Sequence, residues 1–185
     1  MKDYLTDGDA KSVEFTLARL VGGIGLGTLH EQRFFAIRAN GPELRFPFPA
    51  RPFTALVDVA GPIDDGVFKG YAQSLIDHGC VQAVCRGEDS DRLVRIFDEM
   101  AERGDFDRDG TPFTSMCLDD EPLNEAIQYF VLPCGLAQTG LLMVIGDSGD
   151  FQNAIQGFST AAGAIKENIG EPVYTEADLV CFVAN

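Results

Sequence analysis

Residues 53–87 read FTALVDVAGPIDDGVFKGYAQSLIDHGCVQAVCRG, and this stretch decides the fold. Two short apolar runs, Phe53–Val59 and Cys80–Cys85, enclose a segment whose apolar residues recur at helical spacing. Asp64 or Asp65 can cap a helix that begins there, and Gly79 can end it. Strands buried on both faces read as continuous apolar runs, and parallel strands need a crossover between them. The stretch therefore predicts a strand–helix–strand unit of a parallel sheet.

The same alternation continues along the chain and predicts the rest of the sheet. The later predicted elements are a helix from Ser90 or Asp91 to Gly104, a strand at 113–118, a helix after Pro122, a strand at 141–145, a helix at 151–169 and a last strand at 179–183 (LVCFV). The predicted fold class is α/β, a three-layer sandwich with a mostly parallel central sheet, an N-terminal helix and an extra edge strand.

Residues 1–52 predict an N-terminal extension of the 53–185 core. They contain an amphipathic helical pattern at 10–21, a glycine-dense turn at 22–27, an apolar run at 33–37 that predicts the edge strand, and a proline-rich linker at 40–52. A phosphate-binding glycine loop needs a strand before it and a helix after it. Here that order is inverted, so the glycines predict a flexible connection from helix to strand.

Composition limits the function classes. The chain has 185 residues, 29 of them acidic and 14 basic, and a formal net charge of −15. Such a charge repels nucleic acids and anionic membrane surfaces, so neither is expected as a partner. The acidity serves solubility or attracts a basic protein partner.

Cysteine usage and the absence of targeting features predict a cytoplasmic protein. No apolar run is long enough to cross a membrane, and the first residues lack the apolar stretch of a signal peptide. The five cysteines are odd in number, and three of them lie in predicted buried strands. We therefore expect reduced thiols and no structural zinc.

Three short motifs resemble those of a family of small bacterial α/β proteins of unknown function. They are Asp77-His78-Gly79-Cys80, Cys85-Arg86-Gly87-Glu88-Asp89 and Leu118-Asp119-Asp120-Glu121-Pro122-Leu123, and the resemblance covers roughly residues 50–148. In that family a tryptophan commonly precedes the glycine matched by Gly87, and a run containing tryptophan and histidine precedes the acidic motif. This chain has Arg86 and Ser115-Met116-Cys117-Leu118 at those positions, so the resemblance implies the fold and no histidine-based reaction.

Charged residues gather where the predicted strands end. In open parallel sheets, ligands bind beyond the carboxyl ends of the strands. The candidate ligand-binding residues there are Asp58, Arg86, Glu88, Asp119, Asp120 and Asp147. Asp58 is unusual because a carboxylate within an apolar run must be paired or face a cavity. Clustered carboxylates suit Mg²⁺ or Ca²⁺, but aspartate is also the ordinary cap of a helix that follows a strand.

A second acidic group lies between the helix at 90–104 and the next strand. Asp105, Asp107 and Asp109 reproduce the first half of the ligand spacing of an EF-hand. Its twelfth position would be Met116 in place of glutamate, so at most a weak Ca²⁺ site is predicted, against a plain solvated turn.

The sequence favours a non-catalytic protein-interaction domain, which acts through its acidic surface or an apolar edge on another protein or a second copy. Cys85 and Cys117 lie near strand ends, but His78 is predicted at the opposite edge, so no catalytic dyad forms. No cofactor is expected beyond weak Ca²⁺ or Mg²⁺. The alternative is a divalent-metal-dependent enzyme or small-ligand binder that uses the strand-end carboxylates.

Overall fold

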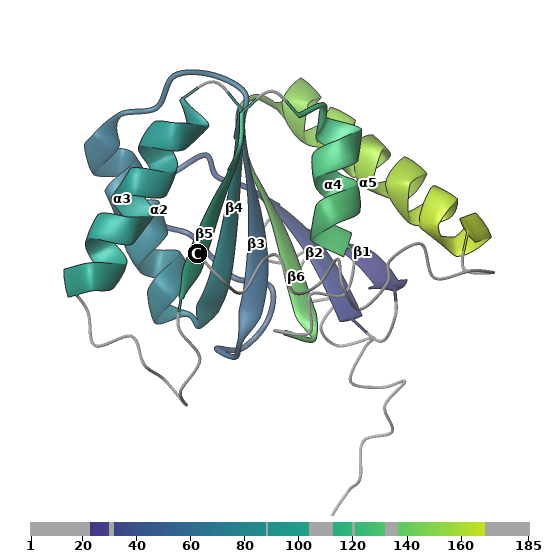
Figure 1. The fold of residues 1–185 in the computed structure, drawn as a ribbon, viewed down its shortest axis with the longest axis horizontal. Helices are drawn as coiled ribbons and strands as arrows, with labels where there is room; N and C mark the ends of the chain where they lie inside the picture. Colours follow the sequence, from purple (N-terminus) through teal and green to yellow (C-terminus); the bar gives the residue numbers. More distant parts are fainter. Residues whose placement is uncertain are drawn as a thin grey trace, which may run out of the picture.

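The computed structural model describes residues 23–29, 32–87, 89–103, 113–119, 121–131 and 137–168. They form a six-stranded sheet in the order β1-β2-β6-β3-β4-β5 (Figure 1). The strands are β1 (Gly23–Leu29), β2 (Gln32–Arg38), β3 (Phe53–Val59), β4 (Cys80–Gly87), β5 (Thr114–Leu118) and β6 (Thr139–Ile145). Only β1 runs antiparallel to its neighbour, so the predicted mostly parallel α/β sheet is confirmed.

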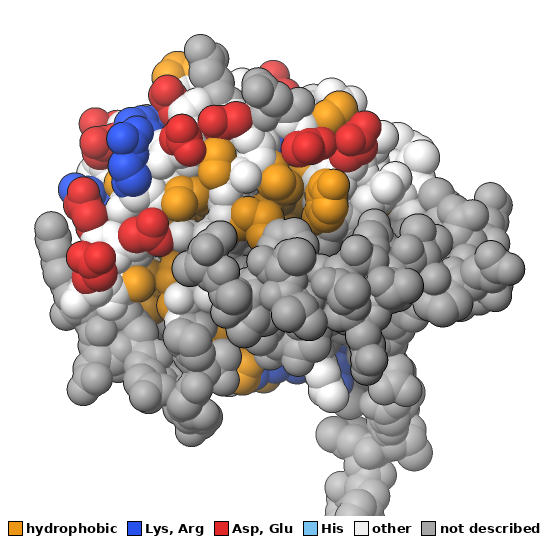
Figure 2. Space-filling model, in the orientation of Figure 1, with side chains coloured by type: hydrophobic (Ala, Val, Ile, Leu, Met, Phe, Trp, Pro, Cys, Tyr) orange, Lys and Arg blue, Asp and Glu red, His pale blue; other side chains and the backbone are white. Residues whose placement is uncertain are grey.

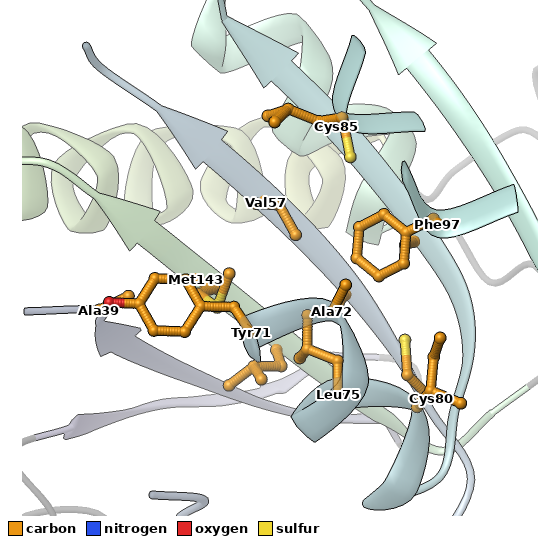
Figure 3. Close-up of a cluster of buried hydrophobic side chains, with 14 of the residues drawn as sticks. Ala39, Val57, Tyr71, Ala72, Leu75, Cys80, Cys85, Phe97 and Met143 are labelled. Atoms are coloured by element: carbon orange, nitrogen blue, oxygen red, sulfur yellow. The ribbon is translucent and has the colours of Figure 1, made fainter. Parts of the chain in front are cut away.

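The described helices are α2 (Asp65–Asp77), α3 (Ser90–Arg103), α4 (Leu123–Val131) and α5 (Ser148–Asn168). Figure 1 shows α2 and α3 on one side of the sheet and α4 and α5 on the other. Because side chains alternate along a strand, each face has its own apolar core. Val57 packs with α2 and α3, as Figure 3 shows, while its neighbour Leu56 packs with α4 and α5.

Helix α2 begins and ends where the sequence predicts. The Asp64 carboxylate accepts hydrogen bonds from the backbone N–H groups of Gly66, at 2.8 Å, and Val67, at 3.2 Å. These bonds satisfy donors that the first turn of a helix leaves free. Gly79 follows the helix with φ of +107°, and a Cβ there would lie 2.5 Å from the Arg51 carbonyl oxygen. Glycine is therefore required at this stop.

The predicted linker at 40–52 contains no helix or strand and leads from the carboxyl end of β2 back to the amino end of β3. The imidazole of His78 stacks on the Phe46 ring at 3.9 Å between centroids, and its Nε2 lies 2.8 Å from the Phe48 carbonyl oxygen. The Tyr71 hydroxyl donates to the Gly41 carbonyl at 2.6 Å. These contacts hold the linker against α2.

Two predictions about the N-terminal third are wrong. The glycine-dense stretch is a strand, β1, because its backbone pairs with β2 across a bulge between Gly25 and Gly27. Strand β2 is not an edge strand, since it pairs with β1 on one side and β6 on the other. Its Phe34 and Phe35 are buried core residues. The predicted helix at 10–21 and strand at 179–183 lie outside the described residues.

Candidate functional site

The carboxyl ends of the parallel strands bring Asp58 and Arg86 together. The two residues are register partners on the neighbouring strands β3 and β4. An Arg86 Nη1–H group donates to Asp58 Oδ1 at 2.5 Å, and Nε donates to the Glu121 carbonyl at 2.9 Å. The Asp58 side chain is 5% exposed and the Arg86 side chain 25% exposed. The carboxylate within the apolar run is therefore an ion-pair partner, and Arg86 ties it to the loop that precedes α4.

Burial governs the protonation of Asp58. Loss of hydration raises the pKa of this carboxyl group, and the hydrogen bond and charge of Arg86 oppose that rise without cancelling it. The negative charge of Asp150 raises it further. A buried carboxyl group with a raised pKa is a recognised feature of acid–base sites. Here its one described polar partner is an arginine, which neither gives up a proton nor attacks a substrate.

Asp147 has a different surrounding, at the start of α5. Its carboxylate accepts hydrogen bonds from the backbone N–H groups of Gly149, at 2.6 Å, and Asp150, at 3.0 Å. The Asp150 carboxylate accepts in return from the Asp147 N–H at 2.8 Å. These backbone donors lower the pKa of Asp147. The pair is a reciprocal helix cap, which is the alternative that the sequence left open for Asp147.

The carboxyl ends of β3 and β6 lie in close contact. The chain leaves these neighbouring strands towards opposite faces, which is where doubly wound sheets bind ligands. In this protein the Ala60 N–H donates to the Ile145 carbonyl at 3.0 Å, so the strand pairing continues into the loop. A Cβ on Gly146 would lie 2.5 Å from Asp150 Oδ2 and 3.0 Å from the Ala60 Cβ. The ends of β3 and β6 and the start of α5 are therefore packed against one another at this point of the sheet.

Asp119 belongs to a second group of polar side chains, beside the end of β5 and the start of α3. The Ser90 hydroxyl, which is fully buried, donates to the Asp119 carboxylate. The Cys117 thiol also contacts that carboxylate, at 3.1 Å. One ligand atom each from Asp91, Cys117 and Asp119 lie within 4.8 Å of one another. This grouping was not predicted, because in the sequence Ser90 and Asp91 indicate only the start of a helix.

The Cys117 thiol is not activated for nucleophilic chemistry. Burial and the neighbouring carboxylates of Asp119 and Asp91 outweigh the hydrogen bond of Ser90 and raise its pKa to about 11. A thiol with such a pKa stays protonated near neutral pH. His78 packs against the linker at the amino end of the sheet, away from this group, so the two residues form no dyad.

A contact between loops involves Arg92, which was not among the predicted candidates, and the remaining candidates lie at undescribed positions. Arg92 contacts the Asp65 carboxylate, the Ile63 carbonyl at 3.2 Å and the Asp89 carboxylate at 3.4 Å, so it joins the starts of α2 and α3. Glu88, Asp120 and the three residues of the predicted calcium turn, Asp105, Asp107 and Asp109, lie outside the described residues.

Residues 37–145 match the family described as "Domain of unknown function (DUF7684)", which spans more than half of the chain. The chain belongs to this family. The expected membership of a family of unknown function is thereby confirmed, and the family's description names no reaction. No curated protein and no solved structure matches the sequence.

The DUF7684 region runs from the end of β2 to the end of β6. It contains the Asp58–Arg86 ion pair and the group around Cys117. The cap formed by Asp147 and Asp150 follows directly after it. Among the described residues, no helix combines the length and apolar character needed to cross a membrane.

Proposed function

We propose that this member of DUF7684 is a non-catalytic protein-interaction domain whose acidic surface recognises a basic partner protein. The surface in question, the acidic edge, comprises the exposed aspartates at the carboxyl end of the sheet, Asp64, Asp65, Asp89, Asp91, Asp119 and Asp147. Acidic side chains gather along the top of the molecule in Figure 2, above the strand ends seen in Figure 1. Because this edge carries several like charges side by side, it attracts cationic surfaces over a distance.

One observation carries the proposal. The described carboxylates at the strand ends cap helices or contact neighbouring side chains, and most of them keep a negative charge that is exposed to solvent. Asp64 and Asp147 cap helices through backbone N–H groups, which do not neutralise a full charge. Two arginines at the edge are engaged, Arg86 with the buried Asp58 and Arg92 with Asp65 and Asp89. The charge of a third, Arg38, acts on Asp147, and the six aspartates still outnumber these cations. The edge therefore keeps a net negative field.

A charge-matched pair of variants tests the proposal. The edge variant carries Asp64→Asn, Asp91→Asn and Asp147→Asn. Asparagine caps helices about as well as aspartate at positions 64 and 147, and Asp91 is exposed, so the fold is preserved. The control variant carries Glu43→Gln, Glu99→Gln and Glu102→Gln, which change the net charge equally at exposed positions elsewhere.

Binding of a lysine- and arginine-rich peptide, followed by fluorescence anisotropy, should weaken several-fold in the edge variant and little in the control. Proteins of the native host that bind the wild-type chain should be lost with the edge variant and retained with the control. Equal weakening in both variants would show that only net charge matters and would contradict the proposal. The attraction should also fall as salt rises, because exposed charges are screened.

The proposal keeps the expected cytoplasmic location. Cys80, Cys85 and Cys117 are free thiols, a state that reducing compartments maintain. Cys80 and Cys85 lie in β4 opposite residues of the apolar strand β3, and both are buried, which suits a structural role.

A second candidate function, a divalent-metal-dependent enzyme or binder, rests on the convergence of Asp91, Cys117 and Asp119. A thiolate and two carboxylates would leave an open position on a tetrahedral ion, as catalytic zinc sites do. Cobalt titration tests it, since a cobalt–thiolate bond gives an intense ultraviolet absorption band. That band should be absent in Cys117→Ser and unchanged in Asp89→Asn, and its absence in the wild-type chain would eliminate this candidate.

A further inference from the structure

One face of β5, at the edge of the sheet, has less helical cover than the other among the described residues. On the α3 side, Ser115 contacts the Asp98 carboxylate, and α3 packs along both β4 and β5. On the other side, α4 packs on β3 and β4, and α5 packs on β1, β2 and β6. Among the described residues, neither helix packs on β5 as extensively as α3 does. The two faces of this edge of the sheet are therefore covered unequally.

The less covered side presents apolar side chains, here called the open face: Val84 of β4 and Met116 and Leu118 of β5. Val84 is buried, whereas Met116 and Leu118 are partly exposed although they pack against the core beneath α4. On α4, the Tyr129 side chain is 48% exposed. Figure 2 shows hydrophobic side chains gathered in the middle of this side of the molecule. Because Met116 and Leu118 are only partly buried, this face can bury further apolar area against another segment.

We propose that residues 179–183 of the same chain (LVCFV) pack against the open face. This run is apolar at every position, so it can contact the sheet on one side and the flank of α4 on the other. It lies after α5, which packs against α4 on the same side of the sheet. The proposal concerns a surface different from the acidic edge and does not depend on it.

The connection from α5 is long enough to reach. Residues 169–178 separate Asn168, the last residue of α5, from the apolar run. An extended chain of that length spans up to about 33–36 Å. Helix α5 packs as far along the sheet as β1, and β5 lies five positions from β1 in the sheet order, which at about 4.8 Å per strand is about 24 Å. The run can therefore lie on the open face without stretching the connection.

The tethered segment is favoured over a second copy of the chain. Each chain carries a net charge of −15, which opposes self-association. A segment joined by a short flexible connection has an effective concentration in the millimolar range at its own surface. Residues 179–183 themselves carry no charge, so they add no repulsion when they approach the protein.

Disulfide trapping through the native Cys181 tests the inference. The full chain is prepared with Cys117→Ser and Cys134→Ser, and then with either Met116→Cys, on the open face, or Ser115→Cys, its neighbour on the α3 side. Under mild oxidation, the Met116→Cys chain should form a disulfide with Cys181 within one chain at least about tenfold faster than the Ser115→Cys chain. Peptide mapping by mass spectrometry identifies the linked residues. Equal rates, no disulfide, or a disulfide between two chains would each overturn the inference.

A second measurement keeps the test independent of the introduced cysteines. In the otherwise wild-type chain, Cys181 should react with a thiol reagent at least about tenfold more slowly than in a Phe182→Asp variant, since a charge in the run prevents its burial. Thr175→Asp, in the connection, is the matched control and should leave Cys181 protected. Equal labelling of the wild-type and Phe182→Asp chains would show that the run is not docked.

Discussion

Asp58 is the one charged side chain that is buried among the described residues, and Arg86 is its ion-pair partner. Replacing Arg86 with methionine removes that partner. Methionine keeps much of the length and apolar volume of the arginine stem, so the change mainly removes the charge and its hydrogen bonds. The carboxylate of Asp58 then stays in the sheet without a cation. We expect this variant to be less stable, by an amount that depends on pH.

The magnitude follows from burial. Removing one member of a buried ion pair costs about 3–5 kcal/mol, because the remaining charge is left without compensation. The Arg86 side chain is 25% exposed, so water already weakens its attraction for Asp58, and we expect the lower end, about 3 kcal/mol near neutral pH. For a chain of this size, 1 kcal/mol corresponds to about 2–4 °C in melting temperature, so the variant should melt about 6–12 °C lower.

The sign of the pH dependence comes from the raised pKa of Asp58. At pH values above 3.8, the ordinary pKa of this carboxyl group, the folded protein holds the proton more tightly than the unfolded chain does. The free energy of unfolding therefore falls as pH rises from that value through the folded pKa. Without Arg86 the folded pKa rises further, and this window extends to higher pH. The loss caused by Arg86→Met should thus be larger at about pH 8 than at about pH 5.

Urea unfolding followed by far-ultraviolet circular dichroism measures this loss, since the chain has no tryptophan to report by fluorescence. In an Asp58→Asn background, Arg86→Met should cost only about 1 kcal/mol, for the lost bond to the Glu121 carbonyl. Arg95→Met, at an exposed position of α3, is the control and should change stability by less than about 0.5 kcal/mol. An equal loss at both pH values, or an equal loss with and without Asp58→Asn, would refute the reasoning.

Three further predictions concern backbone conformation, capping and thiol chemistry. Gly87→Ala should cost at least about 2 kcal/mol in a thermal melt, because Gly87 has φ of +111° and an added Cβ would lie 2.1 Å from the Val59 carbonyl oxygen. Gly70→Ala, in open space on α2, should instead stabilise the protein by about 0.5–1 kcal/mol. A similar effect of both changes would contradict the geometry. Asp64→Ala should lower the free energy of unfolding by about 1 kcal/mol and Asp64→Asn by much less, whereas equal losses would show that the cap contributes nothing. Alkylation of the native protein near neutral pH, read by mass spectrometry, should leave the buried Cys85 unmodified and label Cys117 slowly because its pKa is raised to about 11; rapid labelling of Cys117 would count against that raised pKa.

Local rules explain why the helices and most strands could be predicted. Helix α2 needs apolar residues at helical spacing, a capping aspartate before it and a glycine after it, and all three lie within a few residues of one another. The apolar run of β3 is buried at every position, which is what its composition predicts for an inner strand. Such features depend on neighbours along the chain, so a sequence is enough to find them.

The glycine-rich β1 shows where those rules end. Glycine has a low intrinsic preference for strands, so Gly23–Leu29 predicts a turn when considered alone. It becomes a strand because β2 offers a full row of backbone partners, an interaction that no local preference encodes. For the same reason the sequence did not show that β2 lies inside the sheet: β6, the strand that covers its other side, is formed by residues a hundred positions later.

For the candidate site, the sequence showed that the Asp58 carboxylate requires a compensating partner, and only the tertiary structure showed which residue supplies it. A carboxylate in an apolar run has to be compensated, and that physical requirement identified Asp58 without any coordinates. The register of β3 and β4 decided that Arg86 compensates it, and the insertion of β6 beside β3 brought Gly146 against Ala60 at the carboxyl end of the sheet. Both outcomes depend on which strand edges pair, and pairing is decided by the combined burial of segments far apart in the chain, which the residues of one segment do not specify.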